Sequence, residues 1–130
     1  MPTDLRFDGE KGILVVTVRG SLTLEEFRTT LEEITHSDQY PPDIDTLWDF
    51  QAMDFQAMDS DFFRHIISIR KHYPERGIAR AAHIVAGDFA FGMLRMHEIL
   101  SDADRVGLPQ SMKVSKSFSE GEQWLLDGSA

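Results

Sequence analysis

The sequence predicts an α/β fold: a single domain built on a mixed, mostly parallel sheet of about five strands, in the order ββαβαβαβα. Two patterns carry this prediction. Runs rich in β-branched residues alternate with segments of helical periodicity, and the first two runs are joined by a short turn. Alternating strands and helices favour a parallel sheet, and an initial hairpin adds one antiparallel strand. The 130 residues are one domain's worth of chain with no linker, so we expect residues 1–130 to form one domain.

The first two strands are predicted at residues 4–8 and 13–19. The intervening segment, residues 9–12 (GEKG), has the composition of a turn, so a hairpin is expected. Residues 13–18 are nearly all apolar, which is typical of a strand buried on both faces.

A helix is predicted to begin after Thr23, which forms a capping box with Glu26. Leu22 and Phe27 occupy the two positions of a hydrophobic staple. Apolar residues then recur at intervals of three and four as far as about His36, which predicts one buried helical stripe.

The remaining elements follow the same alternation. A second helix is expected to end at Pro74, because proline cannot continue a helix. The last helix is expected to begin at a capping box formed by Ser119 and Glu122 and to stop at Gly128. The predicted ranges are a strand at 44–50, a loop at 51–60, a helix at 61–73, a strand at 79–86, a helix at about 89–101 and a short strand at 112–116.

Composition limits the classes of function. Thirteen Lys and Arg residues against 22 Asp and Glu residues give a net charge of −9, which disfavours binding to nucleic acids or anionic lipid surfaces. The absence of cysteine excludes disulfides, thiolate metal sites and cysteine nucleophiles. No apolar run is long enough to cross a membrane, and the first residues lack a signal-peptide pattern, so we expect a cytoplasmic protein without membrane insertion.

The strongest pattern for catalysis or metal binding lies before and within the second predicted helix. Asp54, Asp59 and Asp61 cluster there, and His65 follows Asp61 by four residues, on the same helical face. Carboxylates at a helix start are favoured by the helix dipole alone, and this spacing matches no metal motif. We therefore expect no metal, no cofactor and no catalytic site. His83, inside a predicted strand, is interpreted as a hydrogen-bonded core or edge histidine.

The third predicted helix carries more apolar surface than one buried stripe requires. Phe89, Met93, Met96 and Leu100 fall on one face at 100° per residue, whereas Leu94 and Phe91 point elsewhere. Such a helix is either buried in the core or contacts a second subunit or an apolar ligand. The candidate partner or ligand surface comprises Phe89, Phe91, Gly92, Met93, Arg95 and Met96.

A second candidate site is Ser60, which follows Asp59 at the start of a helix. A serine there is usually an N-cap. The alternative is a phosphorylation switch, because a phosphate would interact favourably with the helix dipole, although Asp59 and Asp61 would oppose it.

Several segments resemble the SpoIIAA-like domains, which have a STAS-type fold related in shape to the CRAL-TRIO lipid-binding domain. These segments are Trp48-Asp49-Phe50 at a strand end, the helical passage FGMLRMHEIL and the closing FSEGEQWL, and the element order agrees. The resemblance implies a β-α superhelix without catalytic residues. In the related anti-sigma-factor antagonists a regulatory serine lies at an Asp-Ser step, which corresponds here to Asp59-Ser60. Asp61, Phe62 and Phe63 depart from the small residues that usually follow.

Two functions are therefore expected as alternatives. The first is a non-catalytic regulatory or protein-interaction module that forms a homodimer through the 89–101 helix. The second is a module that binds a small apolar ligand or lipid in a pocket between that helix and the sheet.

Overall fold

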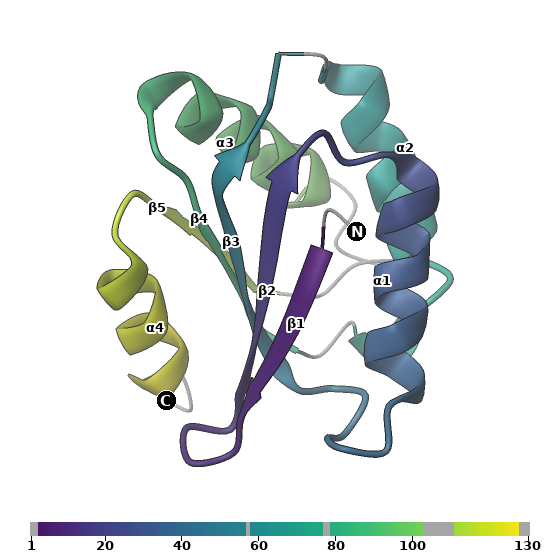
Figure 1. Ribbon diagram of the computed structural model, residues 1–130. Coiled ribbons are helices and arrows are strands. Elements are labelled where there is room, and N and C mark those ends of the chain that lie inside the picture. The colour runs from purple at the N-terminus through teal and green to yellow at the C-terminus, as the bar shows by residue number, and fades with distance from the viewer. Residues whose placement is uncertain (1–2, 57, 77–78, 103–110, 128–130) are drawn as a thin grey trace.

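The computed structural model describes residues 3–56, 58–76, 79–102 and 111–127, and it contains a five-stranded sheet in the spatial order β1-β2-β3-β4-β5 (Figure 1). β1 is antiparallel to β2, and the other neighbouring pairs are parallel. The predicted α/β class and mixed, mostly parallel sheet are therefore confirmed. The strands are β1 (Thr3–Asp8), β2 (Ile13–Gly20), β3 (Asp45–Met53), β4 (Ala81–Ile84) and β5 (Met112–Ser115); the helices are α1 (Leu24–His36), α2 (Ser60–Arg70), the 3-10 turn η1 (Pro74–Arg76), α3 (Asp88–Asp102) and α4 (Phe118–Asp127).

The helices divide between the two faces of the sheet. α1, α2 and α3 connect successive parallel strands, which are added in one direction from β2 to β5. Connections of one handedness place such helices on the same face. α4 follows the last strand and covers the opposite face, as Figure 1 shows for α4 against α1 and α2.

Successive side chains of a strand point to opposite faces of the sheet, so the strands contribute to two hydrophobic clusters. Leu14, Val16 and Val18 of β2 face the larger cluster beneath α1, α2 and α3. Ile13 and Val15 face the smaller cluster beneath α4. Both sets are almost fully buried, as expected for a strand covered on both faces.

The local signals in the first half are confirmed. Asp8 pairs with Ile13 across the hairpin turn, and Gly12 adopts a positive φ of 68° that favours glycine. The capping box is complete: the Thr23 N–H donates to Glu26 Oε1 at 2.9 Å, and the Glu26 N–H donates to Thr23 Oγ1 at 3.1 Å. α1 ends at His36, as predicted.

Two predicted boundaries around the second helix were wrong. The predicted loop at 51–60 begins three residues too early, because Ala52 and Met53 pair with Arg19 and Gly20 after a register shift and extend β3. α2 ends at Arg70 instead of residue 73, and the chain tightens into i→i+3 turns. Proline disfavours helical backbone in the residue before it, which explains why the helix does not reach Pro74.

Two predictions in the second half also need correction. β4 covers only Ala81–Ile84, four residues fewer than the predicted 79–86 strand. The cap of α4 is Ser117, whose Oγ accepts from the Glu120 N–H at 3.2 Å, instead of Ser119. The same Ser-x-x-Glu spacing occurs twice, two residues apart, and the Glu120 carboxylate binds Ser115. The predicted stop at Gly128 lies outside the described residues.

None of the helices in the described part of the chain is both long and apolar enough to cross a membrane.

Candidate functional site

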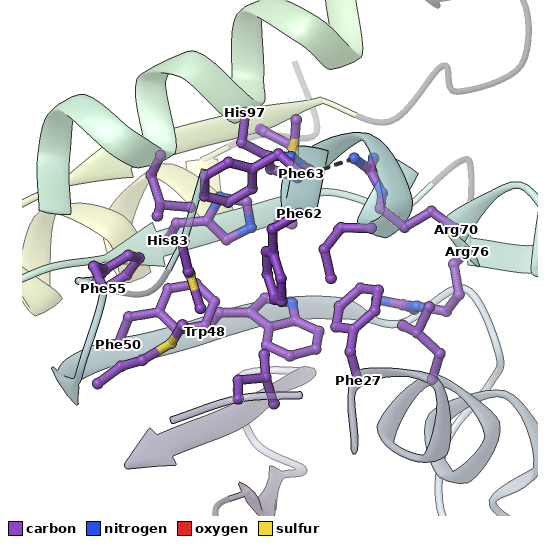
Figure 2. A pocket seen from close by; sticks show the side chains of 18 of the residues that line it. Phe27, Trp48, Phe50, Phe55, Phe62, Phe63, Arg70, Arg76, His83 and His97 are labelled. Carbon is purple, nitrogen blue, oxygen red and sulfur yellow. Dashed lines mark hydrogen bonds between the residues drawn. The ribbon is translucent and has the colours of Figure 1, made fainter. Parts of the chain in front are cut away.

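A cavity of about 70 Å³ lies between the sheet and the three helices that cover its larger cluster (Figure 2). α1 contributes Phe27, α2 contributes Ile66 and α3 contributes Leu94. Most other lining residues are aromatic or methionine, and the cavity therefore belongs to the core beside α3. The lining also includes Leu22, Leu31, Trp48, Phe50, Met53, Phe55, Met58, Phe62, Phe63, Arg70, Tyr73, Arg76, Ala81, His83, His97 and Met112.

Regular periodicity places these side chains in the cavity. Trp48 and Phe50 are two residues apart on β3, so both point to the helix-covered face, and His83 points the same way from β4. On α3, Leu94 and His97 are three residues apart and share the inward face. The site is thus assembled from side chains far apart in the sequence.

The apolar part of the lining includes five aromatic rings, which we call the aromatic wall. Trp48 and Phe50 stack with centroids 5.9 Å apart, and Phe50 meets Phe55 edge-on at 6.0 Å. Such contacts hold rings in fixed relative orientations. The aromatic wall comprises Phe27, Trp48, Phe50, Phe55 and Phe63.

Three nitrogen-bearing side chains form the polar corner of the cavity: Arg70, His83 and His97. Arg70 Nη1 lies 3.3 Å from His97 Nε2 and donates to Ser101 Oγ at 2.9 Å. The rings of His83 and His97 are 6.2 Å apart. In Figure 2 the two arginines, Arg70 and Arg76, lie on one side of the cavity, and Phe50 and Phe55 lie on the other.

Burial controls the charge of the polar corner. His83 is 7% exposed, and burial, followed by the charge of Arg70, lowers its pKa to about 3. Burial and the same charge lower the pKa of His97 well below its usual value. Burial also lowers the pKa of Arg70 to about 10. At neutral pH the two histidines are therefore neutral and Arg70 is charged.

Both histidines hold a buried nitrogen without a partner. Nδ1 of His83 and Nδ1 of His97 make no hydrogen bond to any residue that the structure describes. Buried polar atoms are nearly always paired with protein, water or ligand. The prediction of a hydrogen-bonded core histidine at position 83 was correct about burial and wrong about hydrogen bonding.

Arg76 has a structural role. Its guanidinium donates to the carbonyls of Pro42 and Ile44 and to Thr46 Oγ1, which also accepts from Trp48 Nε1. These bonds tie η1 to the segment that enters β3. Arg76 therefore holds the chain behind the cavity wall.

The acidic residues before α2 do not come together. Asp59 is the N-cap of α2 and accepts from the Phe62 N–H at 2.9 Å. Asp61 forms an ion pair with Arg64, and His65 is exposed. Within the described ranges no group of three His, Asp or Glu side chains could hold a metal ion. Ser60 is the first helical residue and half-buried, so the cap is Asp59, and phosphorylation of Ser60 stays a prediction.

The predicted surface on α3 is divided by the structure. Phe91, Met93 and Met96 are half-buried against the larger cluster, whereas Phe89 is 60% exposed. Arg95 pairs with Glu98, and Gly92 is exposed with open space around it. The buried residues of α3 are Leu94, His97 and Ser101, and Met93, Met96 and Leu100 pack against the larger cluster at partial burial.

The polar corner was missed by sequence reasoning, although a weak signal exists. Each member interrupts an apolar pattern: Arg70 follows Ile66 by four residues, and His97 follows Leu94 by three. A polar residue on a buried stripe indicates either a paired core group or a site. These two alternatives can be distinguished only in the tertiary structure, where the three side chains lie close together.

Comparison with known proteins gives one informative result. No protein-family model matches the chain, and no curated protein matches it at a significant level. A solved structure is similar in fold, with a TM-score of 0.59 and 18% sequence identity, over 95% of this chain and 91% of the other. It is an uncharacterized protein from the DUF3478 family with a SpoIIAA-like fold, from Shewanella loihica PV-4. The chain described here has a SpoIIAA-like fold, as its sequence resemblance predicted.

Proposed function

We propose that this domain is a non-catalytic binding module that takes up a small, largely apolar molecule in the cavity beside α3. The observation that supports the proposal is that the side chains of the aromatic wall leave a cavity of about 70 Å³ between them unfilled. Protein cores normally pack without such space, because each void loses dispersion contacts. A ligand that filled the cavity would restore those contacts.

The size and lining of the cavity suit a small ligand. A cavity of about 70 Å³ has room for several water-sized groups. Met53, Met58 and Met112 lie in its lining, and methionine side chains adapt readily to a new neighbour. We therefore expect a ligand of roughly one aromatic ring or a short alkyl chain.

Trp48 offers a direct test, because it lines the cavity whereas the other tryptophan, Trp124, belongs to α4 and packs against the smaller cluster. A Trp124→Phe variant leaves Trp48 as the only indole. We expect 2-phenylethanol to change its fluorescence saturably and to raise the melting temperature. In the complementary Trp48→Phe variant, the fluorescence of Trp124 should stay constant. The absence of both effects with phenyl and short alkyl probes would contradict the proposal.

The exposed side of α3 favours a second candidate function, a regulatory interaction module that forms a homodimer. Phe89 and Ile99 are each 60% exposed there, so two large apolar side chains of α3 are accessible to a second subunit. Substituting either by Glu should leave the fold intact, whereas Met93 and Met96 contact the core. If wild-type protein sediments as a dimer and Phe89→Glu as a monomer, this surface is the interface; a monomeric wild type at high concentration contradicts it.

A further inference from the structure

His83 places a polar ring among the aromatic side chains of the cavity (Figure 2). It comes from β4 and is 7% exposed, and its ring centroid lies 5.6 Å from that of Phe50. Trp48, its partner in register on β3, also lines the cavity. A polar group in such surroundings is costly when it has lost contact with water and gained no other partner.

The His83 ring makes no hydrogen bond to any residue that the structure describes. Its Nδ1 is enclosed by the protein and has no partner. The other nitrogen, Nε2, has no partner among these residues either, and it is not enclosed. Nε2 is therefore the nitrogen that a molecule in the cavity can reach.

The other two members of the polar corner are already engaged within the protein. Arg70 contacts His97 Nε2 at 3.3 Å, donates to Ser101 Oγ at 2.9 Å and makes a further interaction within the chain. The second nitrogen of His97, Nδ1, is enclosed. His83 therefore has the hydrogen-bonding capacity that a bound molecule can use without displacing an existing contact.

The protonation state of His83 limits the head group that it can bind. Burial lowers the pKa of the ring to about 3, so the ring is uncharged at neutral pH. A neutral imidazole does not compensate the charge of a buried carboxylate or ammonium group. It offers one N–H donor and one lone pair, and its partner determines which of the two is on Nε2. A hydroxyl group suits either tautomer, because it accepts a hydrogen bond from an N–H and donates one to a lone pair.

We propose that the ligand of this cavity is a neutral molecule with an apolar body and one hydroxyl group, a small phenol or alcohol. The body lies against the aromatic wall, and the hydroxyl group forms a hydrogen bond with His83 Nε2. This inference rests on the proposed function, because it names the chemical class that the same cavity takes.

Phenol and toluene test the head group, because they have nearly the same shape and differ by a hydroxyl in place of a methyl group. Binding of each is measured by Trp48 fluorescence in the Trp124→Phe protein, and the ratio of the two affinities is compared between variants. His83→Leu keeps a buried side chain of similar size and removes both nitrogens. We expect it to lower the phenol-to-toluene affinity ratio about 3- to 10-fold, as for the loss of one neutral hydrogen bond.

The possible outcomes separate this inference from the proposed function. If the ratio is unchanged in His83→Leu while either probe binds, the hydroxyl proposal is overturned and the proposed function stands. If benzoate binds more tightly than phenol, the head group is an anion and the hydroxyl proposal is again overturned. If none of the three probes binds, both fail.

Two further variants assign the effect to hydrogen bonding at position 83. His83→Gln restores a donor and an acceptor, so its ratio should lie closer to that of the unsubstituted His83 protein than the ratio of His83→Leu does. His65→Leu is the matched control, because His65 is exposed and does not line this cavity, and it should leave the ratio unchanged. Equal ratios in His83→Gln and His83→Leu, or an equal loss in His65→Leu, would overturn the assignment to His83.

Discussion

The two faces of the sheet differ in how completely the helices that cover them are packed. Beneath α4, Leu47, Ala82 and Ile84 are fully buried, and Gly121 lets the helix approach β4 closely. Beneath α1, α2 and α3 the larger cluster encloses a cavity with buried nitrogen atoms. β4 shows the contrast within four residues, since Ile84 packs on one face and His83 lines the cavity on the other.

This difference indicates how stability and function are divided. A close-packed apolar face contributes stability, whereas a cavity with unpaired polar atoms reduces it. Natural proteins retain such costs mainly at sites with a role. The α4 face therefore contributes mainly stability, and the opposite face holds the candidate site.

The largest expected effect is a difference between core truncations on the two faces. Leu47→Ala on the α4 face creates a new void, so we expect it to reduce the free energy of unfolding by about 3–5 kcal/mol. Met58→Ala on the other face enlarges an existing cavity beside an adaptable side chain, and should cost about 2 kcal/mol or less. Urea unfolding measures both, and equal losses would remove the proposed contrast between the faces.

The second effect is a dependence of stability on pH that originates on the cavity face. His83 has a pKa of about 3 in the folded protein, below the ordinary value of 6.5, so between these values the unfolded chain binds a proton that the folded protein does not. Stability is therefore complete above pH 6.5 and falls as the pH decreases. The pKa of His97 is lowered in the same direction and adds a loss of the same sign.

From pH 7.5 to 5.5 His83 should contribute a loss of about 1.4 kcal/mol, and His97 should add a loss of the same sign. Urea unfolding at several pH values measures the sum, and His83→Leu should remove the contribution of His83. His65→Gln serves as the control, because the exposed His65 side chain is hydrated in both states. A flat profile between pH 7.5 and 5.5 would contradict burial of the two neutral rings.

The smallest effect comes from two helical glycines that differ only in their surroundings. A Cβ at Gly121 would overlap Ile84 Cδ1, so Gly121→Ala should destabilise the protein by about 1–3 kcal/mol through overpacking. A Cβ at Gly92 meets nothing within 4 Å, so Gly92→Ala should stabilise it by about 0.5–1 kcal/mol through helix propensity. Thermal unfolding compares the two directly, and a Gly121→Ala protein as stable as the wild type would show that the α4 face is not tightly packed.

Much of the fold could be predicted because its signals are local. The hairpin turn, the Thr23–Glu26 capping box and the helical periodicities each involve residues within a few positions of one another. The boundaries that failed depend on distant partners. β3 continues to Met53 because β2 offers Gly20 for pairing, and no feature of residues 51–53 alone indicates that partner.

The cap of α4 shows the same limit at close range. Ser117 and Ser119 present identical Ser-x-x-Glu spacings. Ser115, at the end of β5, binds Glu120, and the helix begins at Phe118. The position of the end of β5 therefore determines which of the two equivalent Ser-x-x-Glu sequences caps the helix.

By itself the sequence determined the class of this protein: an α/β chain of SpoIIAA-like order, acidic, without cysteine and without a recognisable catalytic motif. The tertiary structure decided the site. Arg70, His83 and His97 belong to three elements and meet only when α2 and α3 pack on β4. Periodicity predicts which side of a helix or strand is buried. It does not predict whether a buried nitrogen has a hydrogen-bond partner, because that partner is supplied by other elements.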